Sequence, residues 1–378
     1  MKIVLIGTAY PMRGGIAHYI ALLYNALKER GHKVWVVSFS RQYPKILFPG
    51  KTQQDEGKEL ISVRSKPILD SVNPISWLRT AMWIWRIRPD IVIFKYWMPF
   101  FAFCYAAVSL IIKLYSRTRV VYICDNITPH ERIAGTSILT RIALGFVDSY
   151  IVQSRSVLND LLHYKPNASF FHTPHPLYTI FPSGMGKKEA REKLGIKEGR
   201  VILYFGYIRR YKGLRYLIEA MPGVLERLSV RLLICGEFYD QREEIFDSID
   251  RLGLNSCVTI YDKFIPNEMV GVYFSAADLV VLPYISATQS GIVQIAYNYN
   301  RPVVVTNVGG LPEVVKNNQT GFVVPPKCPE AIAEAIIDYY KKNLEKRFSK
   351  NIISEKKKYS WDKMVEAIET LGVRYNES

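Results

Sequence analysis

Short, continuously apolar runs alternate with segments of helical periodicity along the first half of the chain. Residues 2–7 (KIVLIG) form such a run, which is typical of a strand buried on both faces of a sheet. Residues 16–31 repeat apolar side chains at helical spacing and end at Gly31, a common helix stop. Further strands are predicted at 33–39, 89–96, 119–126 and 148–154, and a helix near 136–146. This alternation predicts a parallel sheet with helices on both faces.

The same pattern starts again after residues 172–190, which are rich in Pro, Gly and Ser and lack periodicity. Such a stretch is typical of an interdomain linker. Strands are predicted after it at 200–206, 230–237, 257–262, 278–284, 301–307 and 320–326, and helices at 212–227, 240–252, 266–277 and from residue 290. We therefore predict two doubly wound domains, at 1–175 and 176–360, which also suits a chain of 378 residues. Ligands bind such folds at the carboxyl ends of the strands, and here these ends are expected to face the gap between the domains.

One apolar stretch raises the question of a membrane span, because 17 uncharged residues lie between Lys95 and Lys113. A spanning helix usually needs about 20 residues. The stretch lies between two predicted strands and contains Pro99 near its start, so a crossover helix is favoured over a span. A second alternative is a helix with one face touching lipid. An interfacial patch could be supplied by the upstream residues Trp77, Arg79, Trp83, Trp85, Arg86 and Arg88.

The formal net charge of +16 is concentrated in the first half of the chain. Residues 1–180 hold 22 Lys and Arg against 10 Asp and Glu, whereas residues 181–378 hold 28 against 24. This imbalance indicates a polyanion, an anionic membrane surface or an acidic substrate as a partner of the first half. The alternative is that the charge only keeps the protein soluble. Nucleic acid is disfavoured, because the charge is spread out and no signature of a nucleic-acid-binding fold occurs.

The cysteines and the N-terminus indicate a cytosolic protein. The five cysteines include no CxxC pair, so they are expected to be buried thiols in a reducing compartment, with no metal site. The apolar run at the N-terminus is too short for the core of a secretory signal. The glycosylation sequons at 126, 167 and 318 are then chance matches.

Three cations stand between a predicted strand and the helix that follows it. They are Arg209, Arg210 and Lys212 in the stretch YFGYIRRYKGLRYLIEA. A helix N-terminus already carries positive partial charge. Cations gathered there make sense if a strongly negative group such as a diphosphate binds between them. The alternative is a solvated basic turn.

Two other stretches could also hold an anion. In TQSGIV (288–293), Ser290 and Gly291 open a predicted helix whose first N–H groups can contact phosphate. In PMRGG (11–15), Gly14 and Gly15 stand between the first strand and the first helix. Each stretch alone is a weak signal, but all three are expected at the carboxyl edges of strands. Together they predict phosphate binding.

A series of longer segments occurs in order along the chain: RGGIAHYIALLYNALKERGHKVWVVS, FGYIRRYKGLRYLIEAM, LLICGE, VTIYDKFIPNEMVGVYFSAADLVVLPY, RPVVVTNVGGLPEVVKNNQTGFVVPP and YSWDKMVEAIETL. With these segments the chain resembles a known family, the GT-B glycosyltransferases of retaining family 4. This resemblance implies an α/β fold of two doubly wound Rossmann-like domains facing across a cleft. It also implies that a C-terminal helix, residues 361–378, crosses back to the first domain.

The resemblance further implies a nucleotide-diphosphate sugar on the second domain and a glycan or lipid-linked acceptor on the first. Arg209 and Lys212 would neutralise the departing diphosphate. The other implied donor contacts are the amides of Ser290, Gly291, Ile292 and Val293, the side chains of Thr288, Gln289 and Gln294 at the sugar or ribose, Gly14 and Gly15 from the first domain, and the main chain of Lys263 and Phe264 at the nucleobase. No DxD occurs in the chain, so we expect a reaction without metal and without another cofactor.

The sequence departs from the family at two places. The family usually carries two glutamates where this chain has Ala287 and Ile295, so the identity of the donor cannot be carried over. In CDNITPHE (124–131), Asp125 stands where the family often has histidine, and His130 follows. Either residue could orient the donor sugar or take the acceptor proton. For His130 a hydrogen-bonding role in its own loop remains the alternative.

We therefore expect a cytosolic glycosyltransferase that acts on a lipid-linked or polysaccharide intermediate and can contact the inner face of the membrane peripherally. The resemblance to the family implies that the reaction retains the anomeric configuration. The absent glutamates leave open a catalytically degenerate protein that only binds sugar nucleotides. The positive charge leaves a nucleic-acid-binding protein as a less favoured alternative.

Overall fold

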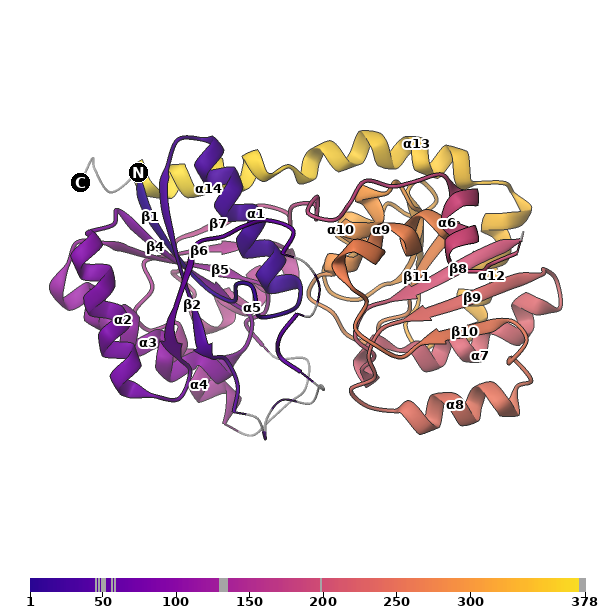
Figure 1. The fold of residues 1–378 in the computed structure, drawn as a ribbon, viewed down its shortest axis with the longest axis horizontal. Helices are drawn as coiled ribbons and strands as arrows, with labels where there is room; N and C mark the ends of the chain where they lie inside the picture. The colour runs from indigo at the N-terminus through magenta and orange to yellow at the C-terminus, as the bar shows by residue number, and fades with distance from the viewer. Residues whose placement is uncertain are drawn as a thin grey trace. The chain divides into compact units, whose positions relative to one another are not determined.

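The chain divides into two compact units in the computed structural model (Figure 1). One comprises Met1–Pro176 with Tyr359–Ser378, and the other is Leu177–Lys358. The structure describes residues 1–44, 46, 48, 52–55, 57, 59–128, 135–197 and 199–373. Each unit is an α/β fold around one parallel sheet, so the predicted pair of doubly wound domains is confirmed.

The first unit is built on a seven-stranded sheet in the order β3-β2-β1-β4-β5-β6-β7. Its strands are β1 (Lys2–Ile6), β2 (Lys33–Arg41), β3 (Ser65–Asp70), β4 (Ile91–Tyr96), β5 (Arg119–Cys124), β6 (Ser149–Val152) and β7 (Phe170–His172). Side chains Ile3 to Ile6 of β1 are fully buried, because helices cover both faces of this central strand. The continuously apolar sequence of β1 is the direct consequence.

Helices flank this sheet on its two faces (Figure 1). They are α1 (Gly15–Glu29), α2 (Pro74–Ile87), α3 (Ala102–Tyr115), α4 (Thr136–Ala143), α5 (Arg155–Tyr164) and α14 (Trp361–Val373), with a 3₁₀ turn at Pro99–Phe101. The C-terminal α14 packs beside α1, with the rings of Trp361 and Tyr19 in edge contact at 5.0 Å. The last described helix therefore belongs to the first unit.

The apolar stretch after Pro99 is α3, a crossover helix between β4 and β5. Its inward face joins the core below the sheet, where Tyr105, Val108 and Ile112 are buried. Among the helices in the described ranges, none combines the length and hydropathy needed to cross a bilayer.

The second unit is built on a six-stranded sheet in the order β10-β9-β8-β11-β12-β13. Its strands are β8 (Arg200–Phe205), β9 (Val230–Cys235), β10 (Val258–Tyr261), β11 (Leu279–Leu282), β12 (Val303–Thr306) and β13 (Gly321–Val324). Its helices are α6 (Lys187–Lys193), α7 (Leu214–Leu225), α8 (Arg242–Arg251), α9 (Asn267–Ala276), α10 (Gly291–Asn298), α11 (Leu311–Val314), α12 (Pro329–Lys341) and α13 (Glu345–Glu355), and 3₁₀ turns occur at Arg210–Lys212 and Lys356–Tyr359.

The helix predicted from residue 212 begins two residues later in the structure. Arg210–Lys212 form a 3₁₀ turn, and α7 starts after Gly213. Gly213 has a φ of +66°, and a Cβ there would lie 2.0 Å from the carbonyl oxygen of Pro283. Only glycine fits this close approach without strain. The cations therefore lie in a tight turn between β8 and α7.

The first unit and the second unit each have a topological switch point, where the sheet grows in opposite directions from two neighbouring strands. In the first unit these strands are β1 and β4, and in the second they are β8 and β11. Loops leaving the carboxyl ends of such strands diverge to opposite faces of the sheet and leave a crevice for ligands. This topology directs attention to the loops after β8 and β11.

Candidate functional site

The loops after β8 and β11 lie side by side. The backbone N–H of Ile285, after β11, donates to the carbonyl oxygen of Tyr211, after β8, at 2.7 Å. A Cβ at Gly206 would lie 3.2 Å from Nζ of Lys212 and 3.4 Å from Cδ1 of Ile292. The predicted cation turn and the first turn of α10 are thus brought together at the switch point of the second unit.

The three cations of the turn have different surroundings. Arg210 is largely exposed and pairs with Glu244 of α8 at 3.2 Å. Arg209 instead lies over the ring of Tyr239 at 4.9 Å, and Lys212 lies 5.7 Å from the ring centre of Tyr284. Neither Arg209 nor Lys212 forms an ion pair with a carboxylate of the described residues. Two cations without an ion-pair partner among the described residues therefore lie at this switch point.

The electrostatic cost of this arrangement is visible at Lys212. Burial, followed by the nearby Arg209 guanidinium, lowers the pKa of Lys212 from 10.5 to about 8. Both causes disfavour the charged form of the ammonium group. A bound anion would remove the repulsion and raise the pKa again.

The first turn of α10 presents backbone donors to the same crevice. Its N-cap is Ser290, whose side chain makes no capping hydrogen bond. Within the described ranges, the backbone N–H groups of Gly291, Ile292 and Val293 donate to no acceptor of the protein. The first N–H groups of a helix, together with its dipole, favour an anion. A Cβ at Gly291 would lie 2.8 Å from the ring of Tyr178, so a larger residue would push against that ring.

One polar side chain on α10 is buried without a partner for its acceptor. Gln294 is 1% exposed, and its Oε1 has no hydrogen-bond partner among the described residues. A buried amide oxygen in this state costs about 1 to 3 kcal/mol. Thr288 is also buried, and its carbonyl oxygen accepts from the N–H of Gly310 at 2.9 Å. Gln289 is partly buried in the same loop.

Aromatic rings from three strand ends collect next to Arg209. The rings of Tyr207 and Tyr239 are 4.7 Å apart, and those of Tyr207 and Phe264 are 6.2 Å apart. Phe264 and the exposed Lys263 follow β10. Sequence reasoning named Lys263 and Phe264 but missed Tyr207 and Tyr239, because these residues follow different strands and only the fold groups them. Flat rings beside a cation are suited to stacking on a planar base.

The positions where the family usually carries glutamates are apolar and enclosed. Ala287 is 7% exposed and Ile295 is 6% exposed. The structure therefore offers no carboxylate at these two positions, in agreement with the sequence.

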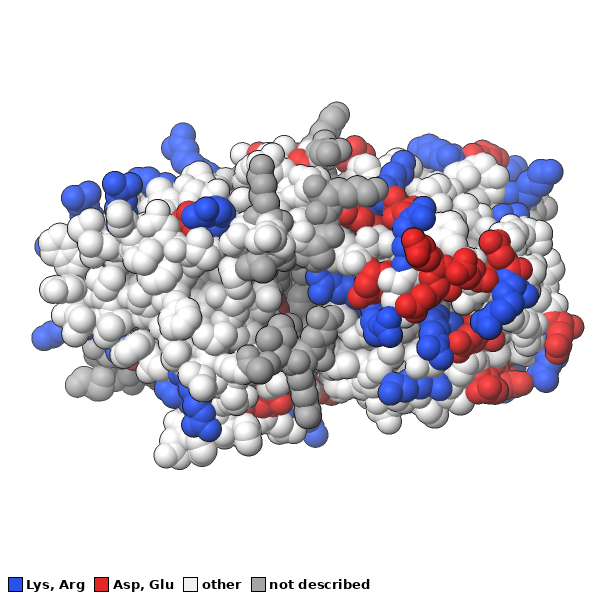
Figure 2. Space-filling view, turned by 90° about the horizontal axis from the view of Figure 1, so that it is seen from below, with Lys and Arg blue, Asp and Glu red and all other residues white. Residues whose placement is uncertain are grey.

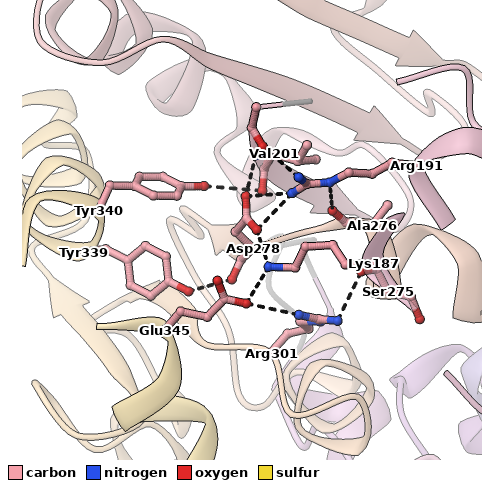
Figure 3. Close-up of polar contacts among 11 residues, drawn as sticks. Lys187, Arg191, Val201, Ser275, Ala276, Asp278, Arg301, Tyr339, Tyr340 and Glu345 are labelled. Atoms are coloured by element: carbon pink, nitrogen blue, oxygen red, sulfur yellow. Dashed lines mark hydrogen bonds and ion pairs between the residues drawn. The ribbon is translucent and has the colours of Figure 1, made fainter. Parts of the chain in front are cut away.

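At the opposite edge of the second sheet, the cations are paired with carboxylates (Figure 3). Asp278, just before β11, accepts from Arg191 at 2.9 Å and from the N–H of Val201 at 2.7 Å, and it also pairs with Lys187. Lys187 and Arg301 both contact Glu345 of α13. Cations at this edge have carboxylate partners, so the bare cations at the carboxyl edge are not a general property of the unit.

In the first unit, the switch point is next to a buried ion pair. Lys95, at the end of β4, is 1% exposed and its Nζ lies 2.6 Å from Oδ1 of Asp125, just after β5. The same ammonium group donates to Gln153 at 3.3 Å and stands 3.3 Å from the ring centre of Tyr19. Burial lowers the pKa of Lys95, and the charge of Asp125 opposes that effect. Asp125 is therefore held by a cation inside its own unit.

The other first-unit residues predicted for the site lie at the start of α1 or outside the described residues. Gly14 is the N-cap of α1 with a φ of +110°, and Gly15 is the first residue of that helix. His130 lies outside the described residues. Within the described part of the chain, no group of three or more His, Cys, Asp or Glu side chains is arranged to hold a metal ion.

Two protein families match the chain, one on each unit. Residues 13–177 match the family described as Glycosyltransferase Family 4. Residues 199–342 match the family described as Glycosyl transferases group 1. The two matches are consecutive and together span most of the chain.

Curated relatives share part of this sequence. An uncharacterized glycosyltransferase of Methanocaldococcus jannaschii is 30% identical over 223 residues, which is 54% of this chain and 55% of the relative. A D-inositol 3-phosphate glycosyltransferase of Corynebacterium glutamicum is 25% identical over 227 residues, which is 57% of this chain and 54% of the relative. The chain thus spans about half the length of the curated relatives that it matches.

Solved structures share the whole fold at low sequence identity. A sucrose-phosphate synthase from Thermosynechococcus elongatus has a TM-score of 0.76 with 18% identity, covering 100% of both chains. HepE of Anabaena, solved in complex with UDP-glucose, has a TM-score of 0.70 with 18% identity, covering 98% of this chain and 99% of HepE. These structures show that the chain has the GT-B fold. The two family matches, which together cover both units, show that the chain belongs to the group 1 and family 4 glycosyltransferases.

Proposed function

We propose that this protein transfers a sugar from a nucleotide-diphosphate sugar to an acceptor. The observation that carries the proposal is the crevice at the β8/β11 switch point. There Arg209 and Lys212 lack carboxylate partners among the described residues, and the first turn of α10 lies close to Lys212. A diphosphate supplies the missing negative charge. HepE was solved with UDP-glucose, which supports the same class of donor.

The proposed roles follow the surroundings of each residue. Arg209 and Lys212 stabilise the charge that develops on the departing diphosphate, and the amides of Ser290 to Val293 hold its oxygens. Oε1 of Gln294 accepts from a hydroxyl of the sugar or ribose, with Thr288 and Gln289 beside it. Tyr207 and Tyr239 frame the nucleobase together with the main chain of Lys263 and Phe264. Gly14 and Gly15 supply backbone contacts from the first unit.

We further propose that Asp125 and His130 serve the acceptor side, where a carboxylate or imidazole can take the acceptor proton or orient the donor sugar. The ammonium group of Lys95, 2.6 Å from Oδ1 of Asp125, holds this carboxylate in place. We propose that the acceptor is a glycan or lipid-linked intermediate and that the protein works in the cytoplasm with peripheral membrane contact. The reaction retains the anomeric configuration in this proposal, and the cations Arg209 and Lys212 replace a metal.

Calorimetric titration with a panel of nucleosides, nucleoside diphosphates and nucleotide sugars tests the donor site. Arg209→Ala and Lys212→Ala should each weaken binding of the diphosphate about 10- to 100-fold, because a charge-assisted hydrogen bond contributes about 1.5 to 3 kcal/mol. Binding of the nucleoside should remain nearly unchanged. An equal loss for nucleoside and diphosphate would contradict the assignment.

Turnover distinguishes the enzyme from a binding protein. The panel of nucleotide sugars is incubated with glycan and lipid-linked acceptors in the presence of a chelator, and the anomeric configuration of the product is read by NMR. Tight diphosphate binding with neither transfer nor hydrolysis would favour the degenerate binding protein, which Ala287 and Ile295 make a real alternative. Activity abolished by the chelator and restored by a divalent cation would overturn the metal-independent step.

A further inference from the structure

The outward face of α2 is apolar, which is the reverse of what a solvated helix shows. Ile75, Leu78, Met82 and Trp85 are 62%, 49%, 42% and 48% exposed. Their spacing of three and four residues places them on one side of the helix. The side of α2 that is buried is mixed, and its residues are Ser76, Thr80, Ala81 and Ile84. Hydrophobic burial in the core therefore does not account for this apolar stripe.

The neighbouring helix α3 continues the apolar surface. Phe103 is 56% exposed and Leu114 is 65% exposed, and Ala107 and Leu110 between them are partly exposed. These four residues follow helical spacing along one side of α3. The two helices pack against each other, and the indole Nε1 of Trp85 donates to the carbonyl oxygen of Tyr115 at 3.2 Å. Two adjacent apolar stripes exceed the scattered apolar side chains of an ordinary surface.

The charged side chains that α2 and α3 themselves carry are all basic, and Lys113 of α3 pairs with Asp148. Asp90 is the single acidic residue between positions 71 and 117, and its Oδ2 accepts from the backbone N–H of Lys2 at 2.7 Å. Arg79 and Arg86 are exposed on α2, and Arg88 follows it. None of these three arginines forms an ion pair with another residue that the structure describes.

The space-filling view separates the two units by the character of their surfaces (Figure 2). On the face shown, the first unit is largely uncharged, with basic side chains toward its edges. The second unit shows acidic and basic side chains mixed together on the same face. On this face, uncharged residues therefore cover most of the first unit.

We propose that the outward faces of α2 and α3 form a docking surface for an anionic lipid bilayer. This combination of apolar side chains and arginines, on helices that carry no acidic residue, matches the two chemical regions of one leaflet. The apolar side chains enter the acyl region, and the guanidinium groups stay at the lipid phosphates. Trp85 at the end of α2 is a residue type enriched at that boundary. A second copy of this chain fits less well, because a self-complementary contact would bring arginines of both copies together without acids to pair them.

This inference rests on the proposed function only in that membrane contact gives access to a lipid-linked acceptor. Beyond that function, we infer which surface makes the contact, that the outward faces of α2 and α3 lie against the bilayer, and that the bilayer is anionic. The docking surface is formed by residues 75–88 and 103–115, none of which belongs to the proposed donor site.

Co-flotation of the full chain with vesicles tests the surface. The vesicles contain phosphatidylcholine alone or with about one third phosphatidylglycerol, at about 0.1 M and about 0.5 M salt. We expect binding to the anionic vesicles that weakens at high salt. Arg79→Gln with Arg86→Gln should reduce the partition coefficient about 25-fold, because each basic residue near an anionic surface contributes about five-fold. Ile75→Ser with Leu78→Ser should reduce it about tenfold or more.

A matched control removes the same charge from the second unit. Lys188→Gln with Lys346→Gln changes two exposed lysines and should leave the partition coefficient within about twofold. Quenching of tryptophan fluorescence by brominated lipids should be weaker in Trp85→Phe than in the wild type. An unmodified protein that fails to float with anionic vesicles, or a control variant that loses as much as Arg79→Gln with Arg86→Gln, would overturn the proposal.

Two further readouts separate this proposal from its alternatives. Light scattering that shows a wild-type dimer and a monomeric Ile75→Ser, Leu78→Ser variant, with vesicle binding unchanged, would identify a self-association surface and overturn lipid docking. Titration with nucleoside diphosphates should give the same affinity for all these variants. If the wild type binds vesicles but no nucleotide, the donor-site proposal fails and the docking surface stands.

Discussion

Replacing Lys212 with methionine should stabilise the unliganded protein while weakening its affinity for nucleoside diphosphates. The pKa of Lys212 falls to about 8 through burial and the charge of Arg209. The folded state therefore carries a cation that it disfavours. Methionine has a similar length and no charge, so it removes the desolvation and the repulsion together.

The size of the stabilisation follows from the pKa shift. A fall from 10.5 to about 8 corresponds to about 3 kcal/mol of differential free energy. Water reaching this half-buried side chain reduces the expected gain to about 1 to 3 kcal/mol. Because the folded pKa lies below the unfolded one, the penalty is complete below pH 8 and disappears as pH rises toward 10.5. The stability advantage of Lys212→Met should therefore shrink over that pH range.

Urea denaturation at several pH values between 7 and 10.5 measures the first effect, and calorimetric titration with nucleoside diphosphates measures the second. The variant should lose about 10- to 100-fold in diphosphate affinity at pH 7. In the wild type, the affinity should fall by about tenfold per pH unit above pH 8, because the free protein then loses the ammonium proton.

Arg210→Met is the matched control in the same turn. Arg210 is exposed and already paired with Glu244, and such surface pairs contribute about 0 to 1 kcal/mol. Its replacement should change neither the unfolding free energy nor the diphosphate affinity by more than this amount. A less stable Lys212→Met protein, or an Arg210→Met protein with the same loss of affinity, would refute the view that Lys212 is a cation held ready for an anion.

Four other substitutions test other parts of the structure. Asp125→Asn should lower the free energy of unfolding by about 3 to 5 kcal/mol, because it leaves the Lys95 ammonium buried without its carboxylate, and urea denaturation measures this. Asp278→Asn should cost a similar amount in the second unit, and an unchanged urea midpoint would contradict that. Burial and Lys95 lower the pKa of His175 to about 4. Wild-type stability should therefore fall by about 2 to 3 kcal/mol as pH drops from 6.5 toward 4, and His175→Gln should lack this loss. Tyr239→Ala should weaken nucleoside and diphosphate binding alike, by about 1 to 3 kcal/mol, whereas a loss confined to the diphosphate would argue against base stacking.

The central strands could be predicted from sequence because burial on both faces makes them continuously apolar. This holds for β1 and β11, which are fully buried in all their central residues. The edge strand β3 (SKPILD) was not predicted, since it exposes Lys66 and Pro67 to solvent and its pattern is mixed. The helix α2 was also missed as a helix. Apolar side chains occur on its exposed side, at Ile75 and Leu78, as well as on its buried side, at Ile84, so the sequence does not show which side faces the core.

The candidate site was predictable only where its residues are close in sequence. The turn with Arg209 and Lys212 was recognisable beside a strand end, but the sequence could not tell which of its cations would remain unpaired. That depends on Glu244, which lies on α8 and meets Arg210 only in the folded unit. The partner of Asp125 was likewise hidden, because the register of β4 beside β5 is what brings Lys95 to it.

The cations at the two switch points differ in whether they are paired, and this difference supports separate roles for the two units in binding donor and acceptor. In the first unit, the Lys95 ammonium at the carboxyl edge is neutralised by Asp125 within hydrogen-bonding distance. In the second, Arg209 and Lys212 form no ion pair with a carboxylate of the described residues. A cation that is already paired gains little from a phosphate, whereas an unpaired and partly desolvated one gains much. We therefore infer that the negative charge of the donor belongs to the second unit. The pair in the first unit leaves that edge suited to the hydroxyl groups of an acceptor.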